Sequence, residues 1–321
     1  GTARATGITI DPGSPPIVVT EDGLPVFAIG PPRSESSPAS AARVDDGSLW
    51  WVGLDGRLVR EKTGAQFVFE VGALADSRIA IRADGVAAVL AEPTDRYPHG
   101  IAGDAIEAGS IALVEPLTGE VTSFTVDDVA VVEGTSPMWI DADGDGHDEL
   151  LVTLSDASEG ARLALFAVSG DRIADGPPVG LGNRWTHQIG AGPVGPDGEF
   201  EIVAVETPHI GGIARWYRLT DGELRIVAES TGVTSHVIYS RNMDMALIAD
   251  ADGDGAFELV TPTADRTQLT GLTRTTDGVE VAWTVPLDGT LVTNLAAGPL
   301  GTGGLALAAG TDAGVLRIWE P

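Results

Sequence analysis

The sequence predicts an all-β fold, and within that class a β-propeller built from four-stranded antiparallel blades. Three observations predict it. Short apolar runs alternate with glycine-containing turns, and 42 of the 321 residues are glycine. The amphipathic spacing that is typical of helices is almost missing. A unit of four strands recurs at intervals of about 51 residues, the period expected of propeller blades. A two-sheet sandwich is the alternative fold, but it would not explain this repeat.

The repeat divides the single predicted domain, residues 1–321, into six approximate blades, and seven would also fit the length. The fourth blade has strands expected at 187–192, 201–206, 213–219 and 224–229. The fifth has them at 245–249, 258–262, 268–274 and 279–285. The last blade is one strand short, so we expect an N-terminal strand within residues 17–30 to complete it and close the ring. The predicted blades cover 31–71, 77–127, 137–179, 186–230, 243–286 and 291–321.

Two acidic loops stand out, each between the first and second strand of its blade. Residues 141–149 and 250–258 place carboxylates at positions 1, 3, 5 and 9 of a turn with two glycines. Converging carboxylates repel one another unless a cation lies between them, and hard oxygen ligands in a flexible loop suit Ca²⁺. An EF-hand is excluded, because its position 12 is a glutamate and here it is Val152 or Thr261. A solvated turn without metal is the alternative.

The two loops therefore predict two calcium sites with matching ligands. In the first, the ligands are Asp141, Asp143, Asp145, Glu149 and the backbone carbonyl of His147. In the second, they are Asp250, Asp252, Asp254, Glu258 and the backbone carbonyl of Ala256.

The motif Asp-x-Asp-x-Asp-Gly-x-x-acid between two blade strands resembles the FG-GAP/VCBS repeats of integrin α-subunit propellers and of many secreted bacterial proteins. The resemblance implies calcium in the third and fifth blades, where it stabilises the blade and takes no part in catalysis. Position 9 is Glu where the family often has Asp. The fourth blade keeps only Asp197 and Glu201, the second keeps only Asp84, and residues 297–304 of the sixth contain no acid. We expect no calcium in those three blades.

Composition excludes several functional classes. Cysteine is absent, which rules out a disulfide scaffold, a zinc ribbon, an iron–sulfur site and a thiol nucleophile. With 47 acidic residues against 19 basic ones, the formal net charge is −28, so nucleic acid and anionic membranes are not expected partners. No apolar run is long enough to predict a membrane-spanning helix. The sequence begins without methionine, and we expect a removed secretion signal and a secreted or periplasmic monomer.

Four of the five histidines fall on the face predicted to lie opposite the acidic loops. His99 and His209 lie in loops between second and third strands, and His187 and His236 lie in connections between blades. They are accompanied by Arg184, Trp185, Tyr239, Arg241 and Asn242. Such a cluster could line a funnel that binds an anion, a sugar or a transition metal, with Trp185 as the stacking residue. The alternative is four loop imidazoles that are exposed or locally hydrogen-bonded.

The leading functional hypothesis is a calcium-stabilised scaffold, without enzymatic activity, that binds a protein or glycan partner. It follows from the family resemblance and from the lack of a dinucleotide fingerprint, a P-loop, a Gly-x-Ser-x-Gly elbow and a His-Glu-x-x-His motif. The alternative is a polysaccharide lyase or hydrolase, or a metal- or anion-binding site, that uses the His/Arg face. A third hypothesis is a spacer within an adhesin. An enzyme should bring at least two of these histidines into one pocket near Arg184 or Arg241.

Overall fold

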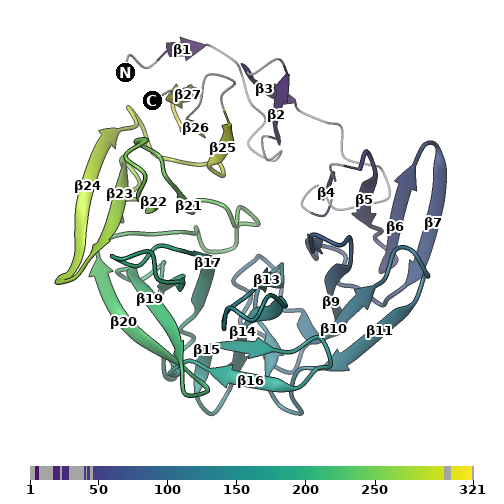
Figure 1. The fold of residues 1–321 in the computed structure, drawn as a ribbon. Coiled ribbons are helices and arrows are strands. Elements are labelled where there is room, and N and C mark those ends of the chain that lie inside the picture. The colour runs from purple at the N-terminus through teal and green to yellow at the C-terminus, as the bar shows by residue number, and fades with distance from the viewer. Residues whose placement is uncertain are drawn as a thin grey trace.

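Strands are the regular elements of this protein wherever its structure is described. The computed structural model describes residues 46–299 and 305–319, together with Ser40 and the backbone of strands at 4–6, 17–21, 24–28 and 42–43. No helix occurs in these ranges, and so none that could cross a membrane. The predicted all-β class is confirmed. Figure 1 shows the strands following one another around a common centre.

Most strands belong to sets of four that pair antiparallel in chain order. The first set is β4 (Ala42–Arg43), β5 (Leu49–Val52), β6 (Arg57–Lys62) and β7 (Ala65–Glu70). The second is β8 (Ala80–Ile81), β9 (Ala87–Thr94), β10 (Glu107–Val114) and β11 (Val121–Thr125). The third is β13 (Met138–Ile140), β14 (Glu149–Asp156), β15 (Gly160–Phe166) and β16 (Arg172–Asp175).

The later sets repeat the arrangement. The fourth is β17 (Thr186–Gly192), β18 (Glu201–Glu206), β19 (Ile213–Thr220) and β20 (Glu223–Thr231). The fifth is β21 (Leu247–Ala249), β22 (Glu258–Pro262), β23 (Gln268–Thr275) and β24 (Gly278–Pro286). The sixth joins β25 (Ala296–Pro299), β26 (Leu305–Gly310) and β27 (Leu316–Trp319) to β1 (Arg4–Thr6).

Short bridges join the second, third and fourth sets into one curled sheet of 13 strands. Strand β12 (Val131–Val132) pairs with both β10 and β14, and β16 meets β20 through the parallel pair Asp175 and Glu223. Strands predicted at 201–206 and 258–262 coincide with β18 and β22. Their neighbours begin or end one or two residues away: most extend into the turn residues, whereas β21 begins two residues later than predicted.

Closure involves a different N-terminal segment from the one expected. The strand that pairs with β27 is β1, with Arg4 opposite Ile318 and Thr6 opposite Leu316. Residues 17–30 were expected to do this, and that expectation is wrong: among the described residues, β2 (Ile17–Glu21) and β3 (Leu24–Ala28) pair with each other in a separate two-stranded sheet. The place beside β27 is already taken by β1, so β2 and β3 have only each other as partners on their facing edges.

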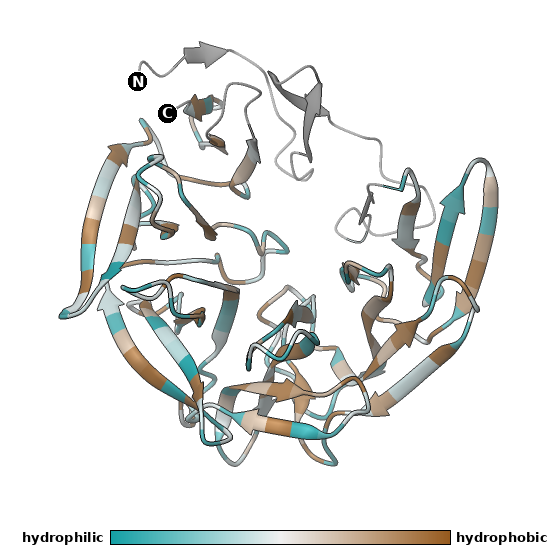
Figure 2. Ribbon diagram, in the orientation of Figure 1, coloured by the Kyte–Doolittle hydropathy of each residue, from teal (hydrophilic) through white to brown (hydrophobic). Residues whose placement is uncertain are grey.

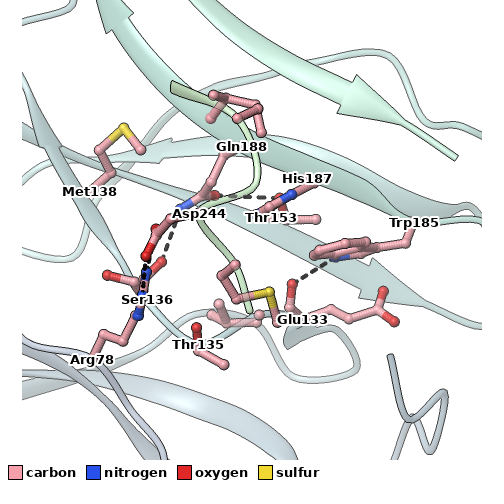
Figure 3. A pocket seen from close by; sticks show the side chains of 15 residues that line it. Arg78, Glu133, Thr135, Ser136, Met138, Thr153, Trp185, His187, Gln188 and Asp244 are labelled. Atoms are coloured by element: carbon pink, nitrogen blue, oxygen red, sulfur yellow. Dashed lines mark hydrogen bonds and ion pairs between the residues drawn. The ribbon is translucent and has the colours of Figure 1, made fainter. Parts of the chain in front are cut away.

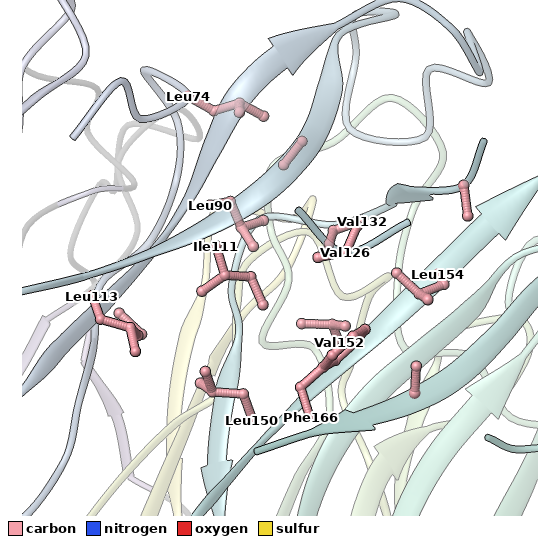
Figure 4. Packing of buried hydrophobic residues seen from close by; sticks show 14 residues of the cluster. Leu74, Leu90, Ile111, Leu113, Val126, Val132, Leu150, Val152, Leu154 and Phe166 are labelled. Carbon is pink, nitrogen blue, oxygen red and sulfur yellow. The ribbon is translucent and has the colours of Figure 1, made fainter. Parts of the chain in front are cut away.

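The core lies between consecutive sets, and the second strands of the third and fourth sets bury both faces in it. In β14, Leu150 and Val152 pack against Leu90 and Ile111 of the second set (Figure 4). Leu151, on the other face of β14, packs in a cluster with residues of the fourth set. Similar clusters connect the first set to the second, the fourth to the fifth and the fifth to the sixth. Figure 2 shows hydrophobic residues in strands around the whole arc. Each set therefore depends on its neighbours for burial.

Candidate functional site

The two acidic loops occupy equivalent places in the third and fifth sets. The first connects β13 to β14, with Ile140 paired to Glu149, and the second connects β21 to β22, with Ala249 paired to Glu258. The loop glycines, Gly144, Gly146, Gly253 and Gly255, all have φ between 76° and 94°, which favours glycine over residues with a Cβ. Backbone N–H groups donate to the first carboxylate of each loop: Gly146 to Asp141 at 3.1 Å and Gly255 to Asp250 at 3.2 Å.

Carboxylates converge in both loops. In the second, oxygens of Asp250, Asp252, Asp254 and Glu258 all lie within 4.8 Å of one another. In the first, the converging set is Asp141, Asp143 and Glu149. Asp145 was predicted as a ligand but lies outside this set, and it accepts the N–H of His147 at 2.8 Å.

Each loop holds one buried carboxylate oxygen that lacks a hydrogen-bond partner among the described residues. These atoms are Oδ1 of Asp141 and Oε1 of Glu258. Burial, with repulsion from the neighbouring aspartates, raises the pKa of Glu258 to about 7, and the same causes raise the pKa of Glu149. A buried, unpartnered oxygen within a group of carboxylates has the chemistry of a ligand for a hard cation, so the residues present fit Ca²⁺.

The fourth set provides an internal comparison. Glu201 begins β18 as Glu149 and Glu258 begin β14 and β22, and it is paired to Gly192 in the same register. Its carboxylate is fully buried and accepts from two guanidinium groups, Arg218 at 2.6 Å and Arg274 at 3.0 Å. In this set, which lacks the three aspartates, side chains of the protein itself supply the positive charge. The corresponding loop of the sixth set includes residues 300–304, which lie outside the described residues.

The structure brings three of the four predicted histidines together around Trp185. The ring centroids of His187, His236 and His209 lie 4.7, 5.2 and 6.1 Å from that of Trp185. Trp185 is only 3% exposed, and its Nε1 donates to the carbonyl of Glu133 at 2.9 Å. The expectation that Trp185 offers a stacking platform to a sugar is wrong, because its faces are covered by imidazoles.

The imidazole nitrogens bond to one another and to neighbouring polar atoms. Nε2 of His236 donates to the carbonyl of Ser240 at 2.7 Å, so its Nδ1 is the acceptor for Nε2 of His209, also at 2.7 Å. Nδ1 of His187 bonds to the Ser235 hydroxyl at 2.8 Å. Among the described residues, three or more potential metal ligands converge in the acidic loops and not in this cluster.

His99 lies at the edge of the cluster, paired with a residue that sequence reasoning missed. Its Nδ1 bonds to the fully buried carboxylate of Glu133, whose other oxygen accepts from the Ser155 hydroxyl. Glu107, also missed, is buried nearby, and burial together with the charge of Glu133 raises its pKa to about 9. Their burial depends on contacts with distant parts of the chain, such as His99 and Ser155 for Glu133, so the local sequence does not reveal it.

The predicted arginines point away from the histidine cluster. Arg184 is exposed and donates to the carbonyl of Val179. Arg241 bonds to Asp76 at 2.9 Å and Asp104 at 2.6 Å, both connected with the second set. Asn242 donates to the carbonyl of Val292 at 3.0 Å. The predicted His/Arg funnel is therefore divided into buried imidazoles and separately paired guanidiniums.

The residues at 237–246, here called the crossing segment, lie between β20 and β21 and project into the centre of the arc (Figure 1). The N–H of Tyr239 donates to the carbonyl of Ile101 at 2.8 Å, and Asp244 forms a two-point ion pair with Arg78. Figure 3 shows this ion pair at one side of a cavity of about 120 Å³, with Trp185 and His187 at the other. The crossing segment thus fills part of the centre.

Histidine ionisation offers a direct test of the buried cluster. Burial, with the nearby imidazoles, lowers the pKa of His209 to about 4, and burial lowers that of His236 to about 4 and that of His187 well below its usual value. The unfolded chain therefore takes up protons between pH 6.5 and 4 that the folded chain does not, and this part of the stability falls as the pH falls through that window. In ¹H–¹³C NMR spectra, the Cε1 signals of these three histidines should not move between pH 8 and 5.5, with free imidazole as the pH reference. Movement of all three near pH 6.5 would contradict burial of the cluster.

Comparison with known proteins identifies no family. No protein-family model matches the chain, and no curated protein matches it. Among solved structures, Kuenenia stuttgartiensis hydrazine synthase is similar over 88% of this chain and 75% of that chain, with 13% sequence identity and a TM-score of 0.49. A similarity of this degree does not identify a function.

Proposed function

We propose that the protein is a six-bladed β-propeller, stabilised by two calcium ions, that acts as a binding scaffold for a protein partner outside the cytoplasm. The observation that carries the proposal is the contrast among three equivalent glutamates. Glu201 has two arginines as counter-charges, whereas Glu149 and Glu258 are surrounded by aspartates. Two acidic sites that contain unpartnered buried oxygens need a cation from solution.

The propeller assignment is supported by the way the sets of strands pack. In the propeller interpretation each set is one blade, and its inner strands are covered by a blade on either side. The burial of Leu150 and Leu151 on opposite faces of β14 fits that arrangement. The pairing of β1 with β27 would close the ring within the sixth blade.

Calcium is the cation favoured by the donor atoms. All the candidate side-chain ligands are carboxylates, which suit hard cations, and the ligand loops are exposed and glycine-containing, which suits a larger ion with flexible coordination. Bound there, calcium would supply charge neutralisation and a connection between the first two strands of a blade. A compartment with millimolar Ca²⁺, outside the cytoplasm, would keep such sites filled.

The enzyme alternative has less support. Catalysis by the predicted His/Arg face would need imidazoles that reach a substrate beside a cation. His187 and His236 are 6% and 2% exposed, and their nitrogens contact Ser235, His209 and the Ser240 carbonyl. Because Trp185 is also buried, a protein partner is favoured over a glycan that stacks on an aromatic ring.

Metal analysis tests the proposal directly. Protein dialysed against buffer with calcium should contain about two Ca²⁺ per chain by inductively coupled plasma mass spectrometry, because each acidic loop is one site. Asp141→Asn and Asp250→Asn should each remove about one ion. Asp197→Asn, in the corresponding loop of the fourth set, is the matched control and should remove none.

Two results would overturn the proposal. Absence of bound metal under these conditions would refute the claim that calcium stabilises the protein. Turnover of a polysaccharide by the calcium-loaded protein would replace the scaffold function by an enzymatic one.

A further inference from the structure

The face opposite the acidic loops, here called the loop face, exposes large apolar side chains. It is formed by loops between second and third strands and by the connections between sets. Leu54, Ile106, Ile210 and Tyr239 are 64%, 44%, 73% and 68% exposed there. Single exposed apolar residues are ordinary, so the grouping matters only where they line a concave surface.

Two of these residues line a groove of about 750 Å³ between the first and second sets. Its apolar walls are formed by Leu54, Leu74, Pro93 and Ile106. Its charged groups are Asp55, Asp76, Asp104 and Arg241, which are three carboxylates against one guanidinium. Apolar walls with an excess of negative charge complement a chain that carries both aliphatic and basic side chains.

The groove already holds one guanidinium group. Arg241 enters it from the crossing segment and is bound between Asp76 and Asp104. Asp55 pairs with Arg57, which is outside the groove lining. The side chains of Asp55 and Asp104 are 50% and 48% exposed, so both carboxylates are accessible to a further cation.

Tyr239 lies beside the groove in a fixed position. Its carbonyl packs against Gly103, where a Cβ would approach to 2.9 Å, and Gly103 precedes Asp104 of the groove. The backbone of Tyr239 has φ of 68°, uncommon for an aromatic residue, and its N–H is bonded to the buried Ile101. Because its backbone is already held, Tyr239 loses only side-chain entropy on binding, and exposed tyrosines are frequent anchors of protein interfaces.

We propose that this groove and Tyr239 bind a short protein segment of alternating basic and aliphatic residues. The aliphatic side chains pack on Leu54 and Ile106, and a basic side chain binds Asp55 or Asp104, with Tyr239 available for contact with a second cation. The net charge of −28 attracts such a segment and repels acidic ones. The proposal rests on the scaffold function and specifies the chemistry of its partner.

Three fluorescein-labelled peptides of equal length serve as probes, containing Arg and Leu, Arg and Ser, or Glu and Leu in alternation. Binding to the calcium-loaded protein is measured by fluorescence anisotropy at physiological ionic strength. The Arg-Leu peptide is expected to bind at least tenfold more tightly than either of the others, because only it can both pack on the apolar walls and pair with the carboxylates of the groove.

Variants locate the binding. The double variant Leu54→Ser/Ile106→Ser and the single variant Tyr239→Ser should each weaken Arg-Leu binding at least fivefold. Leu117→Ser is the matched control, because Leu117 is 87% exposed in the turn between β10 and β11, away from the groove, and it should leave binding unchanged. All four positions are exposed, so the variants are expected to fold, which melting curves confirm.

Equal binding of the Arg-Leu and Arg-Ser peptides would overturn the proposal, because it would show that net charge alone explains the binding and that the apolar walls contribute nothing. Equal effects of Leu117→Ser and the groove variants would also overturn it. A dimer in sedimentation that the groove variants dissociate would assign the groove to a second copy of the chain and overturn the partner chemistry. If none of the peptides binds, but the protein binds calcium and turns over no polysaccharide, the groove assignment alone is overturned. The proposed scaffold function then still stands.

Discussion

Removal of calcium by EDTA is expected to lower the melting temperature by about 10 °C, because two sites saturated at about 100 times Kd contribute about 5 kcal/mol and a large domain loses about 2 °C per kcal/mol. The reason is electrostatic. Without a cation, the carboxylates that converge in each loop repel one another beside the buried Glu149 and Glu258. Differential scanning calorimetry with excess Ca²⁺ and with EDTA measures the difference.

Substitutions separate this effect from general destabilisation. Asp250→Asn should reduce the EDTA-induced shift by about half, because one of the two sites remains. Asp197→Asn should leave the shift unchanged, since its loop lacks the converging carboxylates. If wild-type protein melts at the same temperature in Ca²⁺ and EDTA, the acidic loops do not stabilise the fold through a metal.

Replacement of Glu201 by glutamine is expected to destabilise the protein by about 3–5 kcal/mol, the usual cost of removing one partner from a buried ion pair. The substitution would leave Arg274, which is only 7% exposed, without its counter-charge, and would weaken the contact with Arg218. Urea unfolding of the wild type and the variant measures the difference. The loss should be the same in Ca²⁺ and in EDTA, because this site carries its own cations.

Glu199→Gln is the matched control for Glu201→Gln. Glu199 also pairs with Arg218, at 3.2 Å, but its side chain is 36% exposed, and exposed ion pairs contribute little to stability. If the two variants lose equal stability, the buried network at Glu201 is not the counter-charge that replaces calcium in the fourth set.

The repeat and the acidic loops could be predicted because both are local in sequence. A run such as residues 258–262 is bounded by turn residues on either side, and its apolar pattern indicates a strand without knowledge of its neighbours. The spacing of Asp250, Asp252 and Asp254 places three carboxylates in one turn for the same reason. The structure adds that one carboxylate oxygen in each loop is buried without a hydrogen-bond partner in the described part of the chain, which the sequence alone cannot show.

The histidine face was predicted only in part, because it depends on contacts between distant residues. Three of its histidines do meet, yet they meet around Trp185 as a packed cluster. Glu133 connects the parts: its carbonyl accepts from Trp185 and its carboxylate bonds to His99, two residues that are far from it in sequence. The prediction of the strand that pairs with β27 was wrong for a similar reason. A segment that pairs with itself, as β2 and β3 do, has the same local pattern as a strand that joins β27.

The crossing segment has a consequence for how the chain can be cut and assembled. It ties Asp244 to Arg78 and Arg241 to Asp76, partners separated by about 165 residues, independently of the pairing between β1 and β27. A loop between those points, such as residues 167–171 between β15 and β16, could be opened by a protease while both fragments stayed associated. The protein is therefore suited to fragment complementation across that turn.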